Sequence, residues 1–358
     1  MKPRIFLACL TLSAGALASE RVHVHGYGEV HSNNDLDQDR KLDPHRAVIG
    51  LKAGLAPDAF FNLEVDFEHA FKEPELEFAY VDWVLSSALT LRLGDMLMPV
   101  GPLNEFHEPP LFLSVERPYL HNKLIPTTWQ EIGAGLALSF PEQGLGIRAY
   151  LVNGLNGAKI RAEKGLKGFR SGRFKGVDVV AEDVAGVARV EYSPLAGLSL
   201  GGSGYFGGAD QHADADSQFT VGLYEADLKY KLQGLQVSGQ IAYGNMSGEY
   251  FQSIGADDKS MLGFLGEIAY FVSDALGQGS QLAPFIRYEN INLNSGDGAA
   301  KAGEQVVTGG LAYYPNPNLA LKADAEFWTA EKQDAYTAKS GAKSDTRTVI
   351  NLGVGVMF

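Results

Sequence analysis

The stretch Thr348-Val349-Ile350-Asn351-Leu352-Gly353-Val354-Gly355-Val356-Met357-Phe358 decides the fold of this chain. Its alternate residues form an apolar set, Thr348, Ile350, Leu352, Val354, Val356 and Phe358, and a smaller, more polar set, Arg347, Val349, Asn351, Gly353, Gly355 and Met357. Successive side chains of a β-strand point to opposite faces, so the two sets lie on opposite sides of one strand. Such a strand, ending on an aromatic residue, is typical of the closing strand of a transmembrane β-barrel. We therefore predict a barrel, with Phe358 as the signal read by the barrel assembly machinery.

The first residues are typical of a secretory signal peptide. Lys2 and Arg4 provide positive charge, residues 5–12 are largely apolar, and Ala16-Leu17-Ala18 is a small-x-small cleavage site. We expect residues 1–18 to be removed and residues 19–358 to form the barrel. The single cysteine, Cys9, lies in the segment that is removed. Disulfides, thiol catalysis and cysteine-ligated metals are therefore excluded from the mature chain.

The composition favours membrane strands over membrane helices. No run approaches the roughly 18 consecutive apolar residues that a spanning helix needs. The mean hydropathy of -0.08 fits a barrel, in which lipid-facing and lumen-facing residues alternate and average out. The formal net charge of -13 argues against nucleic acid as a partner.

Alternation of apolar and polar residues recurs along nearly the whole chain. It predicts an all-β, antiparallel transmembrane barrel of about sixteen strands. Short turns, as at 56–58, 141–143 and 315–318, alternate with long polar links, including 32–44, 98–128 and 153–183. Short periplasmic turns opposite long external loops are expected of outer-membrane barrels. A soluble β-sandwich would explain the alternation. It would not explain the signal peptide, the aromatic end and the unequal links together.

Many inward-facing positions of the predicted strands carry charge. The predicted pore-lining residues are the acids Glu64, Asp66, Glu68, Asp324 and Glu326 and the bases Arg92, Arg148, Arg189, Arg287 and Arg347. A dry core could not hold so many charges. A barrel of this size leaves an aqueous lumen instead. The pattern therefore favours passive diffusion of small hydrophilic solutes or ions, with a weak preference for cations because acids match or outnumber bases.

The link at 99–128 is rich in proline and aromatic residues, which predicts an ordered loop. Folded into the lumen, it would present Glu105, His107, Glu108, Glu116 and Arg117 as the pore constriction. The alternative is an ordered surface loop whose charges face bulk water.

Several short motifs in the first third of the chain carry a resemblance. They are Leu42-Asp43-Pro44-His45-Arg46-Ala47-Val48, Leu93-Gly94-Asp95, Pro99-Val100-Gly101, Asn104-Glu105, Glu116-Arg117-Pro118 and Pro126-Thr127-Thr128-Trp129. This region resembles porins related to the phosphate- and polyphosphate-selective porins of Gram-negative bacteria. The resemblance implies a sixteen-stranded barrel, a loop folded into the lumen and often trimers. It would place the chain in the cell outer membrane as a homotrimer, in contact with lipid and lipopolysaccharide.

The resemblance does not transfer a solute. Phosphate-selective members line the lumen with arginine and lysine, whereas here acids match or outnumber bases, so no anion-site residue is carried over. An anion-selective, phosphate-like porin remains an alternative. A second alternative is a barrel that serves as a sheath for a partner such as an electron-transfer cytochrome.

Metal ligands and a basic stretch allow further interpretations. His23 and His25, with Glu29 nearby, could share a metal, although a wetted wall is the commoner role for such a pair. Asp35, Asp37, Asp39 and Asp43 lack the spacing of a calcium-binding helix–loop–helix, but external loops of barrels do bind divalent cations, so calcium remains an alternative here. The basic residues between 159 and 175 could gather anions or bind lipopolysaccharide phosphates, but a solvated external loop is the favoured interpretation.

No catalytic pattern is present in the sequence. It contains no G-x-S-x-G motif and no C-x-x-C-H motif. We therefore expect no enzyme activity, no catalytic residue, no bound metal and no cofactor.

Overall fold

The computed structural model describes residues 22–36, 40–69, 72–160, 168–209, 219–249, 259–293, 303–330 and 346–358. The predicted signal peptide, residues 1–18, lies outside these ranges.

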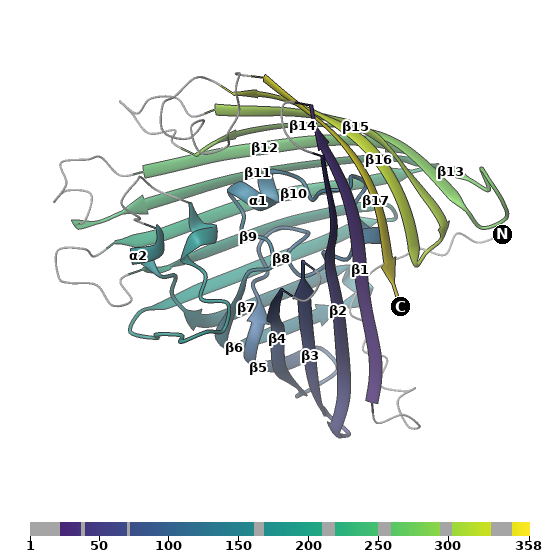
Figure 1. The fold of residues 1–358 in the computed structure, drawn as a ribbon. Helices are drawn as coiled ribbons and strands as arrows, with labels where there is room; N and C mark the ends of the chain where they lie inside the picture. Colours follow the sequence, from purple (N-terminus) through teal and green to yellow (C-terminus); the bar gives the residue numbers. More distant parts are fainter. Residues whose placement is uncertain are drawn as a thin grey trace.

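The described chain is a ring of antiparallel strands (Figure 1). The strands are β1 (Val22–Asp35), β2 (Arg40–Ala56), β3 (Ala59–Glu68), β4 (Glu73–Val84), β5 (Leu89–Leu97), β6 (Gln130–Phe140), β7 (Leu145–Asn153), β8 (Val184–Leu195), β9 (Leu198–Gly208), β10 (Thr220–Leu232), β11 (Leu235–Ser247), β12 (Lys259–Tyr270), β13 (Val272–Ser273), β14 (Gln281–Asn292), β15 (Gly303–Asn316), β16 (Leu319–Ala330) and β17 (Thr346–Met357). The short β13 continues β12, because both pair with β14. The seventeen strands therefore occupy sixteen positions.

The ring closes between its first and last strands. β17 pairs with both β16 and β1, and each strand otherwise pairs with its neighbours in sequence. At the seam, the Phe358 N–H donates to the Gly26 carbonyl over 2.8 Å, and the Gly26 N–H donates to the Phe358 carbonyl over 3.0 Å. The predicted all-β, sixteen-stranded antiparallel barrel is confirmed.

The two faces of β17 differ as the alternation predicts. Ile350, Leu352 and Val354 are 43–56% exposed on the outer face, whereas Asn351 is fully buried on the inner face. Large apolar residues are exposed on the outer faces of the other strands as well, for example Phe206 and Ile241. A belt of this extent exceeds the apolar patches that soluble monomers tolerate. The outer surface is therefore suited to lipid.

The link expected at 32–44 is mostly strand. β1 continues to Asp35 and β2 begins at Arg40. A register shift separates the Glu29–Arg46 pair from the His31–Asp43 pair, and Pro44 lies at this irregularity. Proline is tolerated in strands at such bulges because it has no N–H to donate to the ladder.

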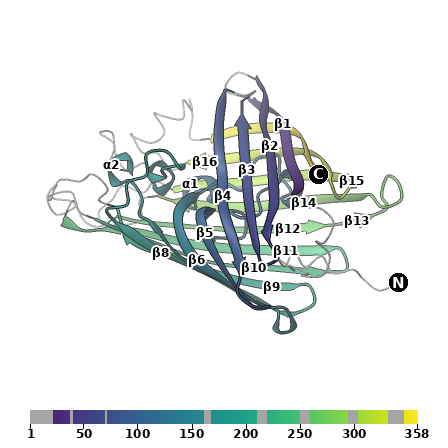
Figure 2. The same cartoon turned by 90° about the horizontal axis from the view of Figure 1, so that it is seen from below.

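Two segments between strands lie inside the ring. The crossing loop, residues 98–129 between β5 and β6, contains η1 (Pro109–Leu111) and α1 (Leu120–Lys123). The covering segment, described at residues 154–160 and 168–183 between β7 and β8, contains α2 (Gly157–Ile160) and η3 (Phe169–Gly172). α1 is enclosed by strands in both views (Figures 1 and 2). Among the described residues, no helix has the length and hydropathy to cross a membrane.

Glycines on the barrel wall make room for both segments. A Cβ on Gly353 of β17 would lie 2.8 Å from Val115, and one on Gly355 would collide with Pro109. On β11, a Cβ on Gly244 would collide with Phe169. The alternating glycines of the terminal strand therefore permit the close approach of the crossing loop.

The two ends of the lumen differ in content. At the end with the long links, buried apolar side chains of the inserted segments pack against those of the strands. They include Met98, Leu120, Leu124, Ile125 and Trp129 of the crossing loop and Leu155, Ile160 and Phe169 of the covering segment. The expectation of a uniformly wet interior is wrong for this end, because apolar burial there fixes the inserted segments.

Candidate functional site

The base of the crossing loop is closed by one side chain, Asn104. Its Oδ1 accepts the Trp129 N–H over 2.9 Å, and its Nδ2 donates to the Met98 carbonyl over 2.8 Å and the Trp129 carbonyl over 2.9 Å. The Met98 N–H also donates to the Trp129 carbonyl over 2.8 Å. Asn104 is fully buried, so these bonds satisfy backbone groups that have no access to water. The two ends of the loop are held together where it leaves the wall.

The crossing loop is hydrogen-bonded to strands on several sides of the barrel. The Gly101 N–H donates to Ser203 Oγ of β9 over 3.1 Å. The Val115 N–H donates to Asp324 of β16 over 2.6 Å, and the Leu120 N–H donates to Glu289 of β14 over 2.9 Å. His121 Nε2 bonds Gln240 of β11 at 2.6 Å. A segment that reaches all these strands must lie across the lumen.

The structure separates the five predicted constriction residues. Glu105 forms an ion pair with Arg148 of β7 at 3.1 Å. His107 is buried, donates from Nδ1 to the Asn104 carbonyl over 2.9 Å, and its Nε2 lies 2.8 Å from both Tyr27 Oη and Glu77 Oε1. Burial raises the pKa of the Glu108 carboxyl.

Glu116 contacts β1, and Arg117 lies near charged groups of β1 and β2. Glu116 accepts hydrogen bonds from His31 over 3.0 Å and from Asn33 over 2.9 Å. Burial acts to raise the pKa of Glu116, but the hydrogen bond from His31 leaves it below its ordinary value. Burial, together with the charge of Arg46, lowers the pKa of Arg117.

A cavity of about 2580 Å³ occupies the end of the lumen with the short turns. The crossing loop meets it through apolar residues, namely Leu103, Phe106, Leu111, Phe112 and Leu113, and through His121. The five predicted constriction residues do not line this cavity. The sequence indicated an ordered loop from its proline and aromatic residues, but it did not show that these apolar residues face the cavity.

The wall of the cavity carries both signs of charge. Its basic residues are Lys52, Arg92, Arg148, Lys229 and Lys231, and its acidic residues are Asp58, Asp82, Glu142, Glu191, Asp227 and Glu267. Of the predicted pore-lining residues, Arg92 and Arg148 belong to this set. Arg92 donates to both Asp82 oxygens, at 2.8 and 3.0 Å. The wall is therefore close to neutral, with one more acid than bases.

The other predicted lining residues are paired or hydrogen-bonded beside the crossing loop. Their partners are His25 for Glu64, Arg46 for Asp66 and Glu68, Glu225 and Asp227 for Arg189, Glu267 and Glu289 for Arg287, Asn351 for Asp324 and Glu326, and Asp35 for Arg347. Burial without such partners would be costly for each charge. Most of these wall charges thus face a partner that can carry the opposite charge, whereas Asp324 and Glu326 accept hydrogen bonds from the neutral Asn351.

The covering segment corrects the expectation of a solvated basic loop. Arg173 is buried and donates to the Thr127 carbonyl and, over 2.7 Å, to the Thr128 carbonyl of the crossing loop. Arg170 donates to Thr127 Oγ1 over 2.8 Å. Burial and the charge of Arg170 lower the pKa of Arg173 to about 10. These cations bind the crossing loop, whereas residues 161–167 lie outside the described ranges.

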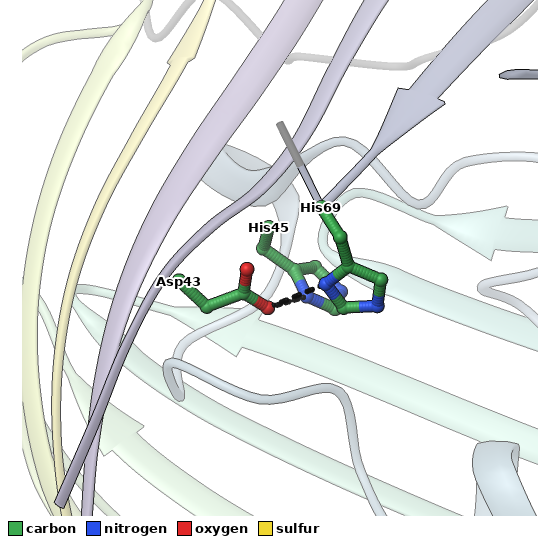
Figure 3. A group of neighbouring side chains, drawn as sticks. All are labelled: Asp43, His45 and His69. Atoms are coloured by element: carbon green, nitrogen blue, oxygen red, sulfur yellow. Dashed lines mark hydrogen bonds and ion pairs between the residues drawn. The ribbon is translucent and has the colours of Figure 1, made fainter. Parts of the chain in front are cut away.

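Within the described ranges, one group brings three metal-ligating side chains together: Asp43, His45 and His69 (Figure 3). The histidines considered as an alternative metal pair, His23 and His25, have ring centroids 6.3 Å apart, and Glu29 bonds His31. Of the aspartates considered for calcium, Asp37 and Asp39 lie outside the described residues, and Asp35 pairs with Arg347.

Solved structures with a similar fold are outer-membrane proteins. OmpF of Salmonella typhi aligns with a TM-score of 0.64 at 14% identity, covering 94% of this chain and 97% of that one. OmpT of Vibrio cholerae has a TM-score of 0.62 at 10% identity, covering 96% and 99%. An anion-selective porin of Comamonas acidovorans has a TM-score of 0.62 at 12% identity, covering 94% and 99%. These likenesses show the fold: a closed antiparallel barrel of the porin type.

No family model matches the sequence, so the predicted membership among phosphate-selective porins gains no support. A protein of Aquifex aeolicus (strain VF5), named "Uncharacterized protein", is 32% identical over 349 residues, covering 88% of this chain and 78% of that protein. Identity at this level over most of both chains shows common membership. The chain therefore belongs to the same family as this Aquifex aeolicus protein, and its fold is the porin barrel.

Proposed function

We propose that this protein is an outer-membrane porin, a passive diffusion channel for small hydrophilic solutes or ions with a weak preference for cations. The observation that carries the proposal is a closed barrel with an apolar outer face and a large, charge-lined cavity that leads to a loop across the lumen. A closed barrel satisfies its backbone without edges, which a bilayer requires. A water-filled cavity with charged walls suits hydrated solutes.

The crossing loop acts as the constriction in this proposal. Glu105, His107, Glu108, Glu116 and Arg117 supply its charge, while Leu103, Phe106 and Leu111 form its edge toward the cavity. The predicted lining residues Glu64, Asp66, Glu68, Arg92, Arg148, Arg189, Arg287, Asp324, Glu326 and Arg347 set the field of the wall. Cation preference is supported by the excess of one acid among the cavity charges and by the net charge of -13.

The proposal includes a cellular setting. Residues 1–18 direct export, Phe358 is read by the assembly machinery, and the outer face contacts lipid and lipopolysaccharide. We further propose a homotrimer, supported by the trimer form described for Vibrio cholerae OmpT.

Two other functions are weaker. A sheath for a cytochrome would need a lumen free for the partner, whereas two segments of this chain already lie in it. An anion-selective channel is supported by the five cavity bases and the likeness to the Comamonas acidovorans porin. The six cavity acids oppose it.

The test is single-channel conductance of refolded protein in a planar bilayer under a salt gradient. We expect stable steps and a cation-directed reversal potential. Glu105→Gln combined with Glu108→Gln should move this potential toward zero, because two acids are lost and Arg148 retains only Glu191 as an ion-pair partner.

The matched control is Glu142→Gln, which removes an exposed acid at the cavity rim and should have a smaller effect. A folded barrel without conductance would overturn the proposal that the protein is a channel. An anion-directed potential would replace the cation preference with anion selectivity, and an unchanged potential in the double variant would place Glu105 and Glu108 outside the ion path.

A further inference from the structure

Three side chains with metal-ligating atoms converge at the end of the barrel with the long links. Asp43 and His45 belong to β2, and His69 directly follows β3 (Figure 3). Asp43 Oδ2 lies 3.3 Å from His45 Nδ1 and 2.8 Å from His69 Nδ1. One ligand atom from each residue lies within 4.8 Å of the others. Two imidazoles thus face a single carboxylate oxygen.

The backbone is shaped to bring these residues together. The register irregularity at Pro44 separates the pair His31–Asp43 from the pair Glu29–Arg46, so that Asp43 and His45 both stand beside the end of β3. His69 has a φ of 49°, in the left-handed region that non-glycine residues adopt at a cost. Its N–H donates to the His45 carbonyl over 3.0 Å, which fixes the two histidines relative to each other.

A second layer of contacts orients His45. The His31 ring stacks on it with centroids 4.6 Å apart and an interplanar angle of 14°. His31 is itself held by Glu29 at 3.1 Å and Glu116 at 3.0 Å. Supporting contacts of this kind are what metal-ligating imidazoles need to keep their orientation.

The donor set has a definite chemical preference. Two imidazole nitrogens and one carboxylate oxygen suit borderline transition-metal dications such as Zn²⁺, whereas Ca²⁺ and Mg²⁺ prefer sites made of oxygen alone. In a tetrahedral zinc site with bonds of about 2.1 Å, ligand atoms lie roughly 3.4 Å apart. The spacing of 3.3 Å between Asp43 and His45 already matches this value. His69 lies at the end of its strand and its side chain is 43% exposed, and a small lengthening of its 2.8 Å contact with Asp43 would bring it to the same spacing.

We propose that Asp43, His45 and His69 bind one divalent transition-metal ion of the Zn²⁺ class. The two Nδ1 atoms and a carboxylate oxygen of Asp43 are the ligands, and water completes the coordination. The ion takes the place of the Nδ1 protons that Asp43 otherwise accepts, and each neutral imidazole then carries its proton on Nε2. Protons are released only from rings that were protonated before the ion bound. Because the cluster is partly exposed and supplies three ligands, the ion exchanges with solution rather than holding the fold together. The site is independent of conduction through the lumen.

The test uses tag-free, refolded full-length mature chain in detergent, titrated with ZnCl₂ by calorimetry and with CoCl₂ by visible absorption. We expect one ion per chain and a tetrahedral or five-coordinate Co²⁺ spectrum. His45→Gln and His69→Gln should each weaken binding at least about tenfold. Affinity should also fall as the pH drops below about 6, where free imidazoles become protonated.

Controls separate this site from other histidines. His23→Gln and His25→Gln should leave binding unchanged, and CaCl₂ should not compete at equal concentration. Folding of each variant is checked by its heat-modifiable mobility on a gel. Absence of stoichiometric Zn²⁺ binding by the folded wild-type chain would overturn the proposal. So would equal binding by the folded His45→Gln variant, or loss of binding only on substitution of His23 or His25.

Discussion

The crossing loop and the covering segment both lie inside the barrel, but they are held there differently. The crossing loop makes its own polar contacts with β1, β7, β9, β11, β14 and β16. The covering segment makes its buried polar contacts largely with the crossing loop, through Arg170 and Arg173 at Thr127 and Thr128. The comparison shows an order of dependence between the two segments. The crossing loop is held by contacts with the barrel strands, whereas the covering segment is held in part by contacts with the crossing loop.

The largest expected effect comes from removing Trp129, the largest fully buried side chain of the apolar cluster in which both segments pack. Trp129 is fully buried, its ring centroid lies 4.7 Å from that of Tyr205, and its Nε1 donates to Glu131 over 2.9 Å. Trp129→Ala should lower the free energy of unfolding by about 3–5 kcal/mol, the usual cost of emptying such a site. Urea unfolding in detergent micelles measures the change, and hydrogen exchange should show faster opening of both segments.

Trp83 provides the matched control. It is 48% exposed on the barrel exterior and donates to Asp58 over 3.0 Å. Trp83→Ala should cost about 1 kcal/mol or less, in line with the loss of a single exposed hydrogen bond. If Trp129→Ala loosened the crossing loop and left the covering segment unchanged, the covering segment would not depend on the crossing loop.

A pH effect should act on the crossing loop through His121. Burial lowers the pKa of His121 to about 3, since its ring is 1% exposed and bonds only the neutral Gln240. The cations facing it are Arg117 of its own loop, Arg189 of β8 and Arg287 of β14. A loop that opens exposes His121, which then binds a proton below about pH 6.5. Docking is therefore strongest above that pH and weakens as the pH falls toward 3.

Hydrogen exchange of amides 120–125, corrected for the intrinsic rate, measures this effect. The free energy of opening should be about 2 kcal/mol lower at pH 5 than at pH 7. His121→Gln should flatten the dependence. Glu108 acts in the opposite sense. Because its pKa is raised in the docked loop, Glu108 stabilises docking at low pH, and this contribution is lost as the pH rises above the ordinary pKa of a glutamate. Glu108→Gln should therefore steepen the loss on acidification, and a flat wild-type profile would refute a neutral buried His121.

The sequence was sufficient to predict the barrel, but not to predict which residues contact one another inside it. Alternation reports which face of each strand is apolar, so the closing strand and the sixteen positions followed directly from it. Proline and aromatic residues indicated that the crossing loop is ordered. The same reasoning failed for Arg173, because its acceptors are the carbonyls of Thr127 and Thr128, which no residue pattern displays. Charge in a long link indicates solvent only when the fold supplies no buried acceptor.

Prediction of the functional site from the sequence was limited for the same reason, because the contacts between distant residues could not be predicted. The sequence placed Glu105 in the link at 99–128, but its partner Arg148 lies on a strand 43 positions away and follows from tertiary geometry alone. The apolar edge formed by Leu103, Phe106 and Leu111 could not be distinguished from core anchors by composition. The Asp43–His45–His69 cluster depends on a local register irregularity, which alternation does not predict.

The smallest expected effect comes from Lys175, which we compare with Arg173 in the same covering segment. Lys175 pairs with Glu75 at 2.7 Å, but the two side chains are 37% and 26% exposed. Lys175→Met should change the opening free energy of amides 168–174 by less than about 1 kcal/mol, since solvent screens such a pair. Arg173→Met should cost about 1–3 kcal/mol in the same assay, because it leaves buried carbonyls without a donor. Neither change should speed exchange in amides 120–125, because the Leu120 N–H donates to Glu289 of β14 and the amides of 121–125 donate to carbonyls of the crossing loop itself. Faster exchange there in the Lys175→Met variant would mean that the covering segment supports the crossing loop, rather than resting on it.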